Sequence, residues 1–350
     1  MARIPHRIFS IAIAAVALGG CAQRGPSADT AALPAIKEVG SFHIGGEEVT
    51  LSGLPTSEIV FSPGAPPVKL DPNGDFTVGQ MYVRYTRLAE PQSPLPLLMW
   101  HGGGLAGTTY ETKPDGEPGW EMAFLKAGWD VYLSDAVERG RASWARYPEI
   151  YEGEPVFRTK KEAWELFRIG KRYASDPAQR VALPGQQFPV QAFEQFTKQS
   201  IPRWANNDAR TQKAYNQYVD QVCPCVLVAH SQGGNFAVNA ALRHPDKVKA
   251  IVLVEPAGTP DLAKTDLSPL ANTPMLWVWG DYIDQYPFWQ RVKERQETFR
   301  QAVVRAGGRG DLLDLPAEGI QGNSHMVMMD RNADEVAARI QAWLSEVALP

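Results

Sequence analysis

Short apolar runs separated by helical patterns constrain the fold of this chain more than any other feature of its sequence. The runs are PLPLLMW (94–100), DVYLSD (130–135), CVLVAHS (225–231), KAIVLVEP (249–256), PMLWVWGD (274–281) and GDLLDLP (310–316). Continuous apolar runs of this length are typical of parallel strands, which helices cover on both faces. The pattern predicts an α/β fold with a mostly parallel central sheet flanked by helices.

The segment before these runs has a different pattern. SFHIGGEEVTL (41–51) contains two strand-like halves around Gly45 and Gly46, which predicts a β-hairpin. FTVGQMYVRYTRL (76–88) alternates in the manner of a further strand. We therefore expect an antiparallel edge to open the fold.

A long insertion separates the runs at 130–135 and 225–231. Residues 142–222 are richer in aromatic side chains than the whole chain, of which 10% is aromatic. These rings are either the core of the insertion or the wall of a ligand pocket over the strand ends, and we expect a cap that does both. The predicted organisation is an α/β domain in two parts, 38–141 and 223–350, with a cap inserted between them.

The first 21 residues have the pattern of an export signal. MARIPHR is positively charged, IFSIAIAAVALGG is apolar but too short to cross a bilayer, and Cys21 follows directly. LGGC resembles the lipobox of bacterial lipoproteins, in which the cysteine is lipidated, and the alternative is ordinary cleavage to a soluble periplasmic or secreted product. Residues 22–37 are predicted to be a flexible tether.

Charge and motif content disfavour several classes of function. The net charge is -4 and no basic block is present, so nucleic acid is not an expected partner. HExxH and GxxxxGK[ST] are both absent from the sequence, so we expect neither a metal nor another cofactor. Cys223 and Cys225 lack metal-ligand spacing and are interpreted as buried thiols, although a disulfide stays possible in an oxidising compartment.

Ser231 stands at the corner between an apolar run and a helical pattern. The nucleophile of an α/β-hydrolase occupies a tight turn from strand to helix, where the residues two before and two after it must be small. In AHSQG these residues are Ala229 and Gly233. The alanine departs from G-x-S-x-G but meets the same demand for small size, so Ser231 is the predicted nucleophile.

A serine nucleophile needs a histidine base later in the chain. The chain contains six histidines, which are His6, His43, His101, His230, His244 and His325. Only His325 follows the last apolar run and precedes a C-terminal helical pattern, which is where this fold places its base. His325 is therefore the predicted base.

The sequence offers more than one acid to orient His325. Glu255 ends KAIVLVEP, while Asp281 and Asp284 follow PMLWVWG, the strand end that this fold uses more often. Spacing alone favours Asp284. Either carboxylate would stabilise the imidazolium form of His325.

The loop MWHGGGLAG (99–107) supplies candidates for an oxyanion hole. It resembles the HGGG-type loop that donates a backbone N–H beside the N–H that follows the nucleophile. We predict that Gly103 and Gln232 are the two donors.

Several longer stretches resemble the exported bacterial serine esterases that cleave halogenated cyclic compounds. These stretches are ETKPDGEPGW, LFRIGKRY, QFPVQA, AHSQGG, VEPAG, GDYIDQYPFW and GNSHMVMMDRN, and the likeness covers most of the chain after the export signal. The resemblance implies that the acid is the glutamate of VEP, Glu255, in place of Asp284. That family carries two adjacent cysteines where this chain has Gly103 and Gly104, so the resemblance does not extend to the conformation of this loop.

Together these features predict a serine carboxylic-ester hydrolase that forms an acyl-enzyme and acts on small apolar or cyclic esters. Amides, carbon–carbon bonds and lipids are alternative substrates of the same machinery. A catalytically inactive surface lipoprotein that binds an apolar ligand is the alternative from another class. Oligomeric state and the natural ester are not encoded in any pattern that we identify.

Overall fold

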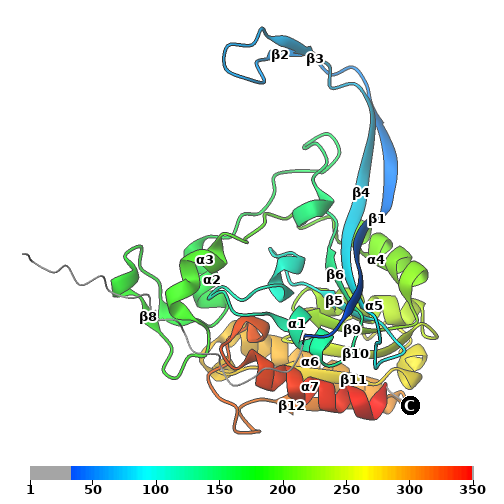
Figure 1. The fold of residues 1–350 in the computed structure, drawn as a ribbon, viewed down its shortest axis with the longest axis vertical. Helices are drawn as coiled ribbons and strands as arrows, with labels where there is room; N and C mark the ends of the chain where they lie inside the picture. Colours follow the sequence, from blue (N-terminus) through cyan, green and yellow to red (C-terminus); the bar gives the residue numbers. More distant parts are fainter. Residues whose placement is uncertain (1–32, 349–350) are drawn as a thin grey trace, which may run out of the picture. The chain divides into compact units, whose positions relative to one another are not determined.

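An eight-stranded sheet organises the computed structural model of the protein, which describes residues 33–348. Its strand order is β1-β4-β6-β5-β9-β10-β11-β12, and the neighbours from β6 to β12 are parallel (Figure 1). The strands are β1 (Ile36–Leu51), β4 (Gly74–Leu88), β5 (Leu97–Trp100), β6 (Val131–Asp135), β9 (Cys225–His230), β10 (Val248–Val254), β11 (Met275–Trp279) and β12 (Gly310–Asp314). The structure confirms the predicted α/β fold with its mostly parallel sheet.

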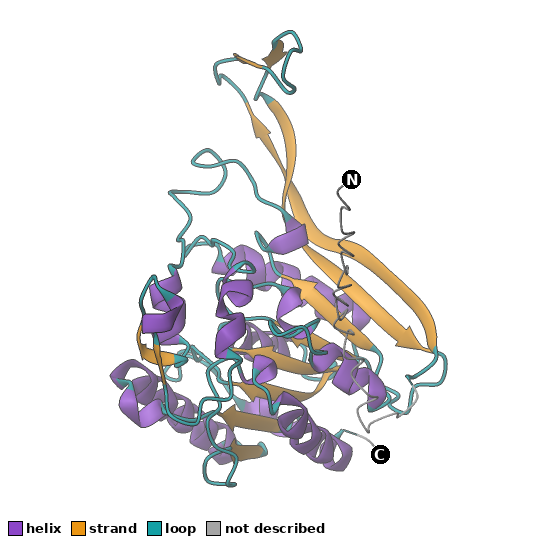
Figure 2. Cartoon of the chain, turned by 60° about the vertical axis from the view of Figure 1, so that its left-hand side comes forward, coloured by secondary structure: helices purple, strands orange, loops and turns teal. Residues whose placement is uncertain are grey.

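Helices cover both faces of the sheet (Figure 2). The helices are α1 (Trp120–Lys126), α2 (Lys160–Leu166), α3 (Phe193–Thr197), α4 (Asp208–Val222), α5 (Gly233–Arg243), α6 (Pro287–Arg305) and α7 (Ala333–Val347). Successive side chains of a strand point to opposite faces, so Val226 joins the core under α1 and α7 while Leu227 joins the core under α4, α5 and α6. This double cover is why the central strands are apolar throughout.

The antiparallel edge is present, but the glycines predicted to form its hairpin turn do not turn the chain. Gly45 and Gly46 have φ angles of +76° and +94° inside the continuous strand β1, which pairs with β4 on either side of them. The chain reverses farther on, in residues 52–73, where β2 (Ser57–Ile59) and β3 (Val68–Leu70) form a small sheet. The hairpin prediction is wrong at this position because pairing with β4 accommodates both glycines within the strand.

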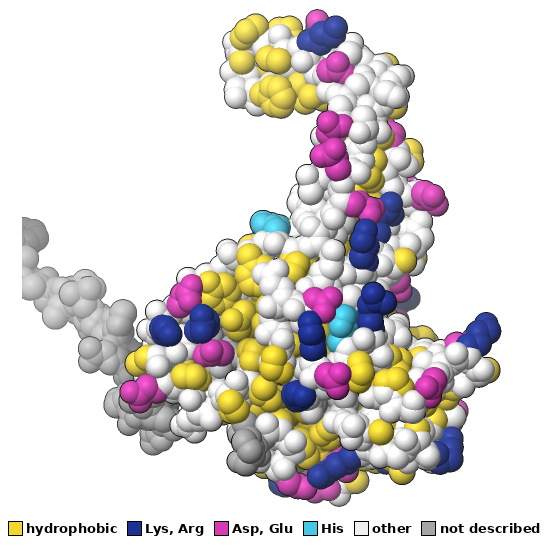
Figure 3. Space-filling model, turned by 90° about the vertical axis from the view of Figure 1, so that its right-hand side faces the viewer, with side chains coloured by type: hydrophobic (Ala, Val, Ile, Leu, Met, Phe, Trp, Pro, Cys, Tyr) yellow, Lys and Arg dark blue, Asp and Glu magenta, His cyan; other side chains and the backbone are white. Residues whose placement is uncertain are grey.

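The end of this β1–β4 arm carries exposed apolar side chains. Figure 3 shows hydrophobic side chains gathered at its tip. They include Ile59, Val60, Phe61, Val68 and Leu70, of which Phe61 is 69% exposed.

The insertion between β6 and β9 contains α2, α3, the two-stranded sheet of β7 (Gly170–Arg172) and β8 (Val181–Ala182), and several short 3-10 helices. Phe188, Phe193 and Phe196 pack into the core of the insertion, which is continuous with the core beneath α7. The predicted insertion, 142–222, also includes α4. This helix packs against the sheet, where Tyr215 stacks on Trp100 with ring centroids 3.9 Å apart.

The short 3-10 helices complete the fold. They are η1 (Gly107–Tyr110), η2 (Gly140–Ala142), η3 (Pro177–Gln179), η4 (Val190–Ala192), η5 (Ser268–Asn272), η6 (Ile283–Gln285) and η7 (Val327–Met329).

Cys223, which follows α4, and Cys225, the first residue of β9, form a disulfide, which corrects their interpretation as thiols. No helix within residues 33–348 is long and apolar enough to span a membrane.

Candidate active site

Ser231 lies in a tight turn between β9 and α5. Its φ angle is +52°, a left-handed conformation that is uncommon for a non-glycine residue. The turn is held because the Ser231 N–H donates to the Val254 carbonyl at 3.0 Å, and the Ser231 carbonyl accepts from the N–H groups of Gly234 and Ala257. A methyl carbon on Gly233 would lie 2.7 Å from the His101 carbonyl oxygen, so the turn requires glycine there.

His325 lies in the loop between β12 and α7, close to this turn. The His230 ring, next to Ser231 in the chain, donates through Nε2 to the His325 carbonyl at 3.0 Å, and the two imidazole centroids are 4.6 Å apart. The rings of Trp289 and Phe167 flank His325, with centroids 4.2 Å and 5.4 Å from the centroid of its imidazole. His325 is only 1% exposed, and its burial lowers its pKa to about 4 although the Glu255 carboxylate acts to raise it.

A buried carboxyl holds the loop that carries His325. Asp330 accepts hydrogen bonds from the Ser324 N–H and hydroxyl at 2.8 and 2.7 Å and from the Asn323 side chain at 2.9 Å. Burial raises the pKa of Asp330 to about 7, and the hydrogen bonds from Ser324 and Asn323 counteract the rise. The position of His325 therefore depends on hydrogen bonds formed within its own loop.

Glu255 accepts a hydrogen bond from Nδ1 of His325 at 3.1 Å. It follows β10, has a φ angle of +50°, and is completely buried. The Gly280 N–H donates to its Oε1 at 2.6 Å, and Arg168 donates to both carboxylate oxygens, at 3.0 and 2.5 Å. Burial acts to raise the pKa of Glu255, but the Arg168 charge and the bonds to His325 and Arg168 lower it to about 2.

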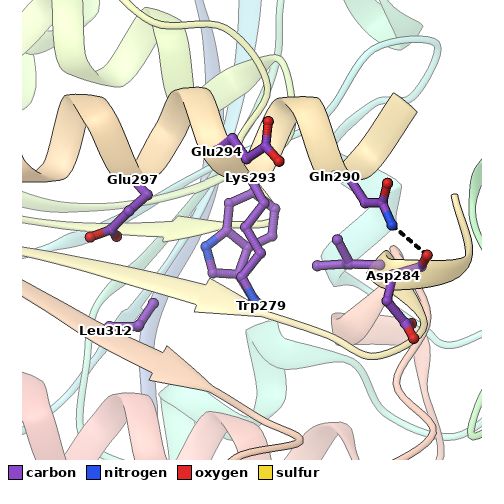
Figure 4. A pocket seen from close by; sticks show the side chains of 8 residues that line it. Trp279, Asp284, Gln290, Lys293, Glu294, Glu297 and Leu312 are labelled. Atoms are coloured by element: carbon purple, nitrogen blue, oxygen red, sulfur yellow. Dashed lines mark hydrogen bonds between the residues drawn. The ribbon is translucent and has the colours of Figure 1, made fainter. Parts of the chain in front are cut away.

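Neither of the two aspartates after β11 is hydrogen-bonded to the His325 ring. Asp284 is exposed in a groove of about 780 Å³ between α6 and β12, where its carbonyl accepts from the Gln290 side chain (Figure 4). Asp281 instead supports the loop, because its carboxylate accepts from the Gly322 N–H at 2.8 Å. Among residues 33–348, only Glu255 is hydrogen-bonded to a ring nitrogen of His325.

Sequence reasoning missed Arg168. It comes from the insertion, is completely buried, and donates through Nε to the Asp281 carbonyl in addition to its two bonds to Glu255. Arg168 lies in LFRIGKRY, one of the stretches that resemble the esterase family. An arginine in a polar-looking stretch gives no sign that it will be buried, so the only available signal was that resemblance.

The glycine loop after β5 lies beside the serine turn. A methyl carbon on Gly102 would approach Ser231 Cβ to 3.0 Å, and one on Gly103 would approach the Gln232 side-chain oxygen to 3.2 Å. Within residues 33–348, no acceptor binds the N–H of Gly103 or of Gln232. Both donors are therefore free to bind a ligand oxygen.

A second groove, of about 580 Å³, begins next to this loop. Its lining includes Ala106 and Ile201, and the Ile201 N–H donates to the Gly104 carbonyl at 2.9 Å. The part of the chain that the structure describes holds no cluster of three or more metal-ligating side chains. The residues brought together at the site are thus a serine, a histidine, a glutamate and free backbone donors.

Comparisons with known proteins identify the family of the chain. A family model described as alpha/beta hydrolase fold matches residues 221–305. A solved structure described as that of a novel bacterial esterase is 32% identical, with a TM-score of 0.77 over 93% of this chain and 98% of that chain. The fungal "Probable secreted lipase phiG" (Fungal sp., strain ATCC 74256) is 25% identical over 341 residues, which cover 77% of this chain and 89% of the fungal protein. This chain belongs to the α/β-hydrolase superfamily.

Proposed function

We propose that the protein is a serine carboxylic-ester hydrolase with Ser231, His325 and Glu255 as its catalytic triad. The observation that carries the proposal is the 3.1 Å hydrogen bond from Nδ1 of His325 to Glu255, beside the strained turn of Ser231. This bond leaves Nε2 of His325 unprotonated and available as a base. The relatives described as an esterase and a secreted lipase support the same reaction class.

The reaction proceeds in two steps. His325 accepts the proton of the Ser231 hydroxyl, and the serine oxygen bonds to the ester carbonyl carbon. The N–H groups of Gly103 and Gln232 stabilise the resulting oxyanion, a donation worth about 2.7 to 4 kcal/mol per donor in comparable enzymes. The bond to the alcohol oxygen then breaks, and the alcohol leaves with the proton from His325.

Water completes the cycle. His325 accepts a proton from water, whose oxygen bonds to the acyl carbon, and the bond from that carbon to Ser231 breaks. The carboxylic acid leaves and Ser231 regains a proton from His325. Glu255 stays ionised throughout and stabilises each imidazolium form, because its pKa of about 2 keeps it charged at neutral pH. These steps require no cofactor.

The surroundings of His325 favour small apolar or cyclic esters. The rings of Phe167 and Trp289 give the base two aromatic neighbours, in keeping with the resemblance to esterases of halogenated cyclic compounds. Amide and carbon–carbon bond cleavage use the same triad and are tested with the same variants. Lipase activity would be distinguished by activation at an oil interface.

The alternative of a surface lipoprotein that only binds an apolar ligand has less support. A decayed enzyme has little need of a serine held at φ +52° or of a buried glutamate bonded to a histidine, since both are costly to maintain.

Labelling with a fluorophosphonate probe, together with hydrolysis of p-nitrophenyl butyrate, tests the proposal. Wild type and the matched surface variant Ser62→Ala are expected to react, and Ser231→Ala is expected to lose both labelling and turnover. Ser62 is exposed in the β1–β4 arm, so it controls for the loss of a hydroxyl. A folded wild type that neither labels nor hydrolyses the ester would move the assignment to the binding protein.

We also propose that the chain is exported and anchored through Cys21, which lies outside the described residues. The relative described as a secreted lipase supports export, and LGGC supports lipidation. Membrane fractionation of Cys21→Ala tests the anchor. Unchanged membrane association of this variant would reject lipidation and leave ordinary signal cleavage.

A further inference from the structure

Two stretches of the insertion, residues 156–158 and 201–204, form a ribbon that is hydrogen-bonded to the proposed oxyanion loop. Val156 and Arg203 form an antiparallel bridge, with the Val156 N–H donating to the Arg203 carbonyl at 2.7 Å and the reverse bond at 3.2 Å. The Ile201 N–H donates to the Gly104 carbonyl at 2.9 Å, and the Trp204 N–H donates to the Glu138 carboxylate at 2.8 Å. The side chains that leave this ribbon therefore have set positions relative to the loop.

Two arginines from the ribbon reach the loop. A methyl carbon on Gly103 would lie 3.6 Å from Nη1 of Arg203, and one on Gly104 would lie 3.7 Å from Nε of Arg158. The Arg158 guanidinium also lies over the Phe167 ring, 5.1 Å from its centroid, and Phe167 flanks His325. Arg158 therefore lies between the glycine loop and a ring that flanks His325, and Arg203 lies beside Gly103.

Much of the donor capacity of these arginines is unused. Within residues 33–348, no side chain or carbonyl accepts a hydrogen bond from the Arg203 guanidinium. Arg158, with a side chain 22% exposed, donates from Nη1 to Glu162 at 2.7 Å, but its buried Nε has no acceptor in the described chain. The buried Nε of Arg158 requires an explanation, because an unsatisfied buried donor is costly, whereas Arg203 is only half-buried.

A third arginine, Arg139, adds to the positive charge near Arg203. Arg139 is 4% exposed, and its Nε and Nη1 have no acceptor among the described residues. Its one close acid is Glu138, at 3.6 Å, which already accepts from Trp204 and from Asn207. Asp208 is exposed and accepts from the Gln232 side chain. Within residues 33–348, three guanidinium groups thus have two contacting carboxylates, Glu138 and Glu162, of which only Glu138 is buried.

The directions of the arginine pKa shifts agree with this geometry. Burial lowers the pKa of Arg139 to about 10 and also lowers the pKa of Arg158, and the charge of Arg203 contributes to the lowering in each case. Like charges that lower one another's pKa values are stabilised by a bound anion. A guanidinium fork pairs with a planar carboxylate through two parallel hydrogen bonds.

We propose that Arg203 and Arg158 form a subsite for a carboxylate carried by the ester substrate. The inference rests on the proposed esterase function and narrows it, because it selects esters that bear one negative charge besides the reacting group. The unsatisfied donors of Arg203 bind the carboxylate directly, and Arg158 and Arg139 maintain the positive potential around it.

The test compares two esters of equal length, mono-p-nitrophenyl adipate and its methyl ester, which differ by one negative charge. Wild type is expected to have the higher kcat/KM for the monoacid, and this preference should weaken as salt screens the charge. Arg203→Gln is expected to reduce the ratio of the two kcat/KM values by about tenfold or more, the loss typical of a charge-assisted hydrogen bond. Arg203→Lys should retain part of the preference. Arg305→Gln, at the exposed end of α6, removes the same charge and should leave the ratio unchanged.

Direct binding separates this inference from the proposed reaction. Calorimetry measures the binding of monomethyl adipate and of dimethyl adipate to Ser231→Ala, which does not turn them over. The monoacid is expected to bind more tightly than the diester. This difference should disappear in the double variant that also carries Arg203→Gln. Circular dichroism checks the fold of each variant, and Arg158→Gln provides a second test if Arg203→Gln does not fold. Equal losses on both esters would assign Arg203 to the oxyanion and overturn the subsite. A ratio and an affinity difference that do not respond to either arginine would overturn it as well.

Discussion

Arg168 and Glu255 form a completely buried, two-pronged ion pair between the insertion and the end of β10. Both residues have positive φ angles, +56° and +50°, so the backbone is strained on each side of the pair. The same carboxylate accepts the bond from His325. The insertion therefore contributes to holding the proposed base, in addition to covering the strand ends.

We expect Arg168→Met to lower both stability and turnover. Removing one partner leaves the Glu255 charge buried and uncompensated, which typically costs about 3 to 5 kcal/mol. Urea unfolding measures the first effect, and kcat for p-nitrophenyl butyrate measures the second. Arg168→Lys keeps the charge but not the two-pronged geometry, so it should fall between wild type and Arg168→Met. A variant without the arginine that unfolds and reacts like wild type would show that the ion pair has no role in the site.

The two candidate acids are separated by comparing Glu255→Gln with Asp284→Asn. We expect Glu255→Gln to reduce kcat by a factor on the order of 10² to 10⁴, because the amide no longer stabilises the imidazolium. Asp284→Asn should remain near wild type, since Asp284 is exposed in a different groove. Thermal unfolding identifies any loss that comes from the unpaired Arg168. Loss of turnover in a folded Asp284→Asn alone would reverse the assignment.

The pH dependence of turnover should reflect the low pKa of His325. The ring must be neutral to accept the serine proton, and burial lowers its pKa to about 4 from 6.5. The acid limb of kcat/KM is therefore expected near pH 4, with full activity already present at pH 6.5. The stability of the protein should also fall with pH in this range. Between pH 4 and pH 6.5 the unfolded state binds more protons at His325 than the folded state does. The contribution of His325 to the free energy of unfolding is therefore lost as pH falls from 6.5 to 4. An acid limb centred at pH 6.5 would contradict the buried environment of the ring.

Asp330 should have the opposite effect on stability. Its pKa is raised to about 7 from 3.8, so the folded state binds more protons and the contribution of Asp330 is lost as pH rises through 7. Asp330→Asn removes this titration. The difference in the free energy of unfolding, Asp330→Asn minus wild type, should therefore increase between pH 4 and pH 8. Urea midpoints measured across this range provide the test, and a constant difference would mean that Asp330 does not titrate there.

Neighbouring glycines in the serine turn should differ in their tolerance of a methyl group. Gly233→Ala places a carbon 2.7 and 2.8 Å from the carbonyl oxygens of His101 and Trp100, which are backbone atoms. We expect a loss of about 1 to 3 kcal/mol and a lower kcat, because relief of the clash displaces Ser231. Gly234→Ala meets only Pro256 Cβ at 3.1 Å and Leu253 Cδ2 at 3.2 Å and should cost less. Chemical unfolding and labelling of Ser231 measure both effects, and equal behaviour of the two variants would reject this account.

The amino-acid sequence alone determined the features that depend on local pattern. Continuous apolar runs require cover on both faces, so they predicted the parallel sheet. The small residues around Ser231 predicted its turn because backbone crowding is a local property. The place of His325 in chain order predicted it as the base.

Only the tertiary structure decided which groups from distant segments come together. Spacing favoured Asp284, yet Glu255 is the carboxylate hydrogen-bonded to His325, and Asp284 lies exposed in another groove. Arg168 reaches Glu255 across 87 positions, and no local pattern encodes that distance. Gly45 and Gly46 have the conformation expected of a turn, but pairing with β4 keeps the strand continuous. In each case the outcome depends on a partner elsewhere in the chain, and the packing of the folded protein supplies that partner.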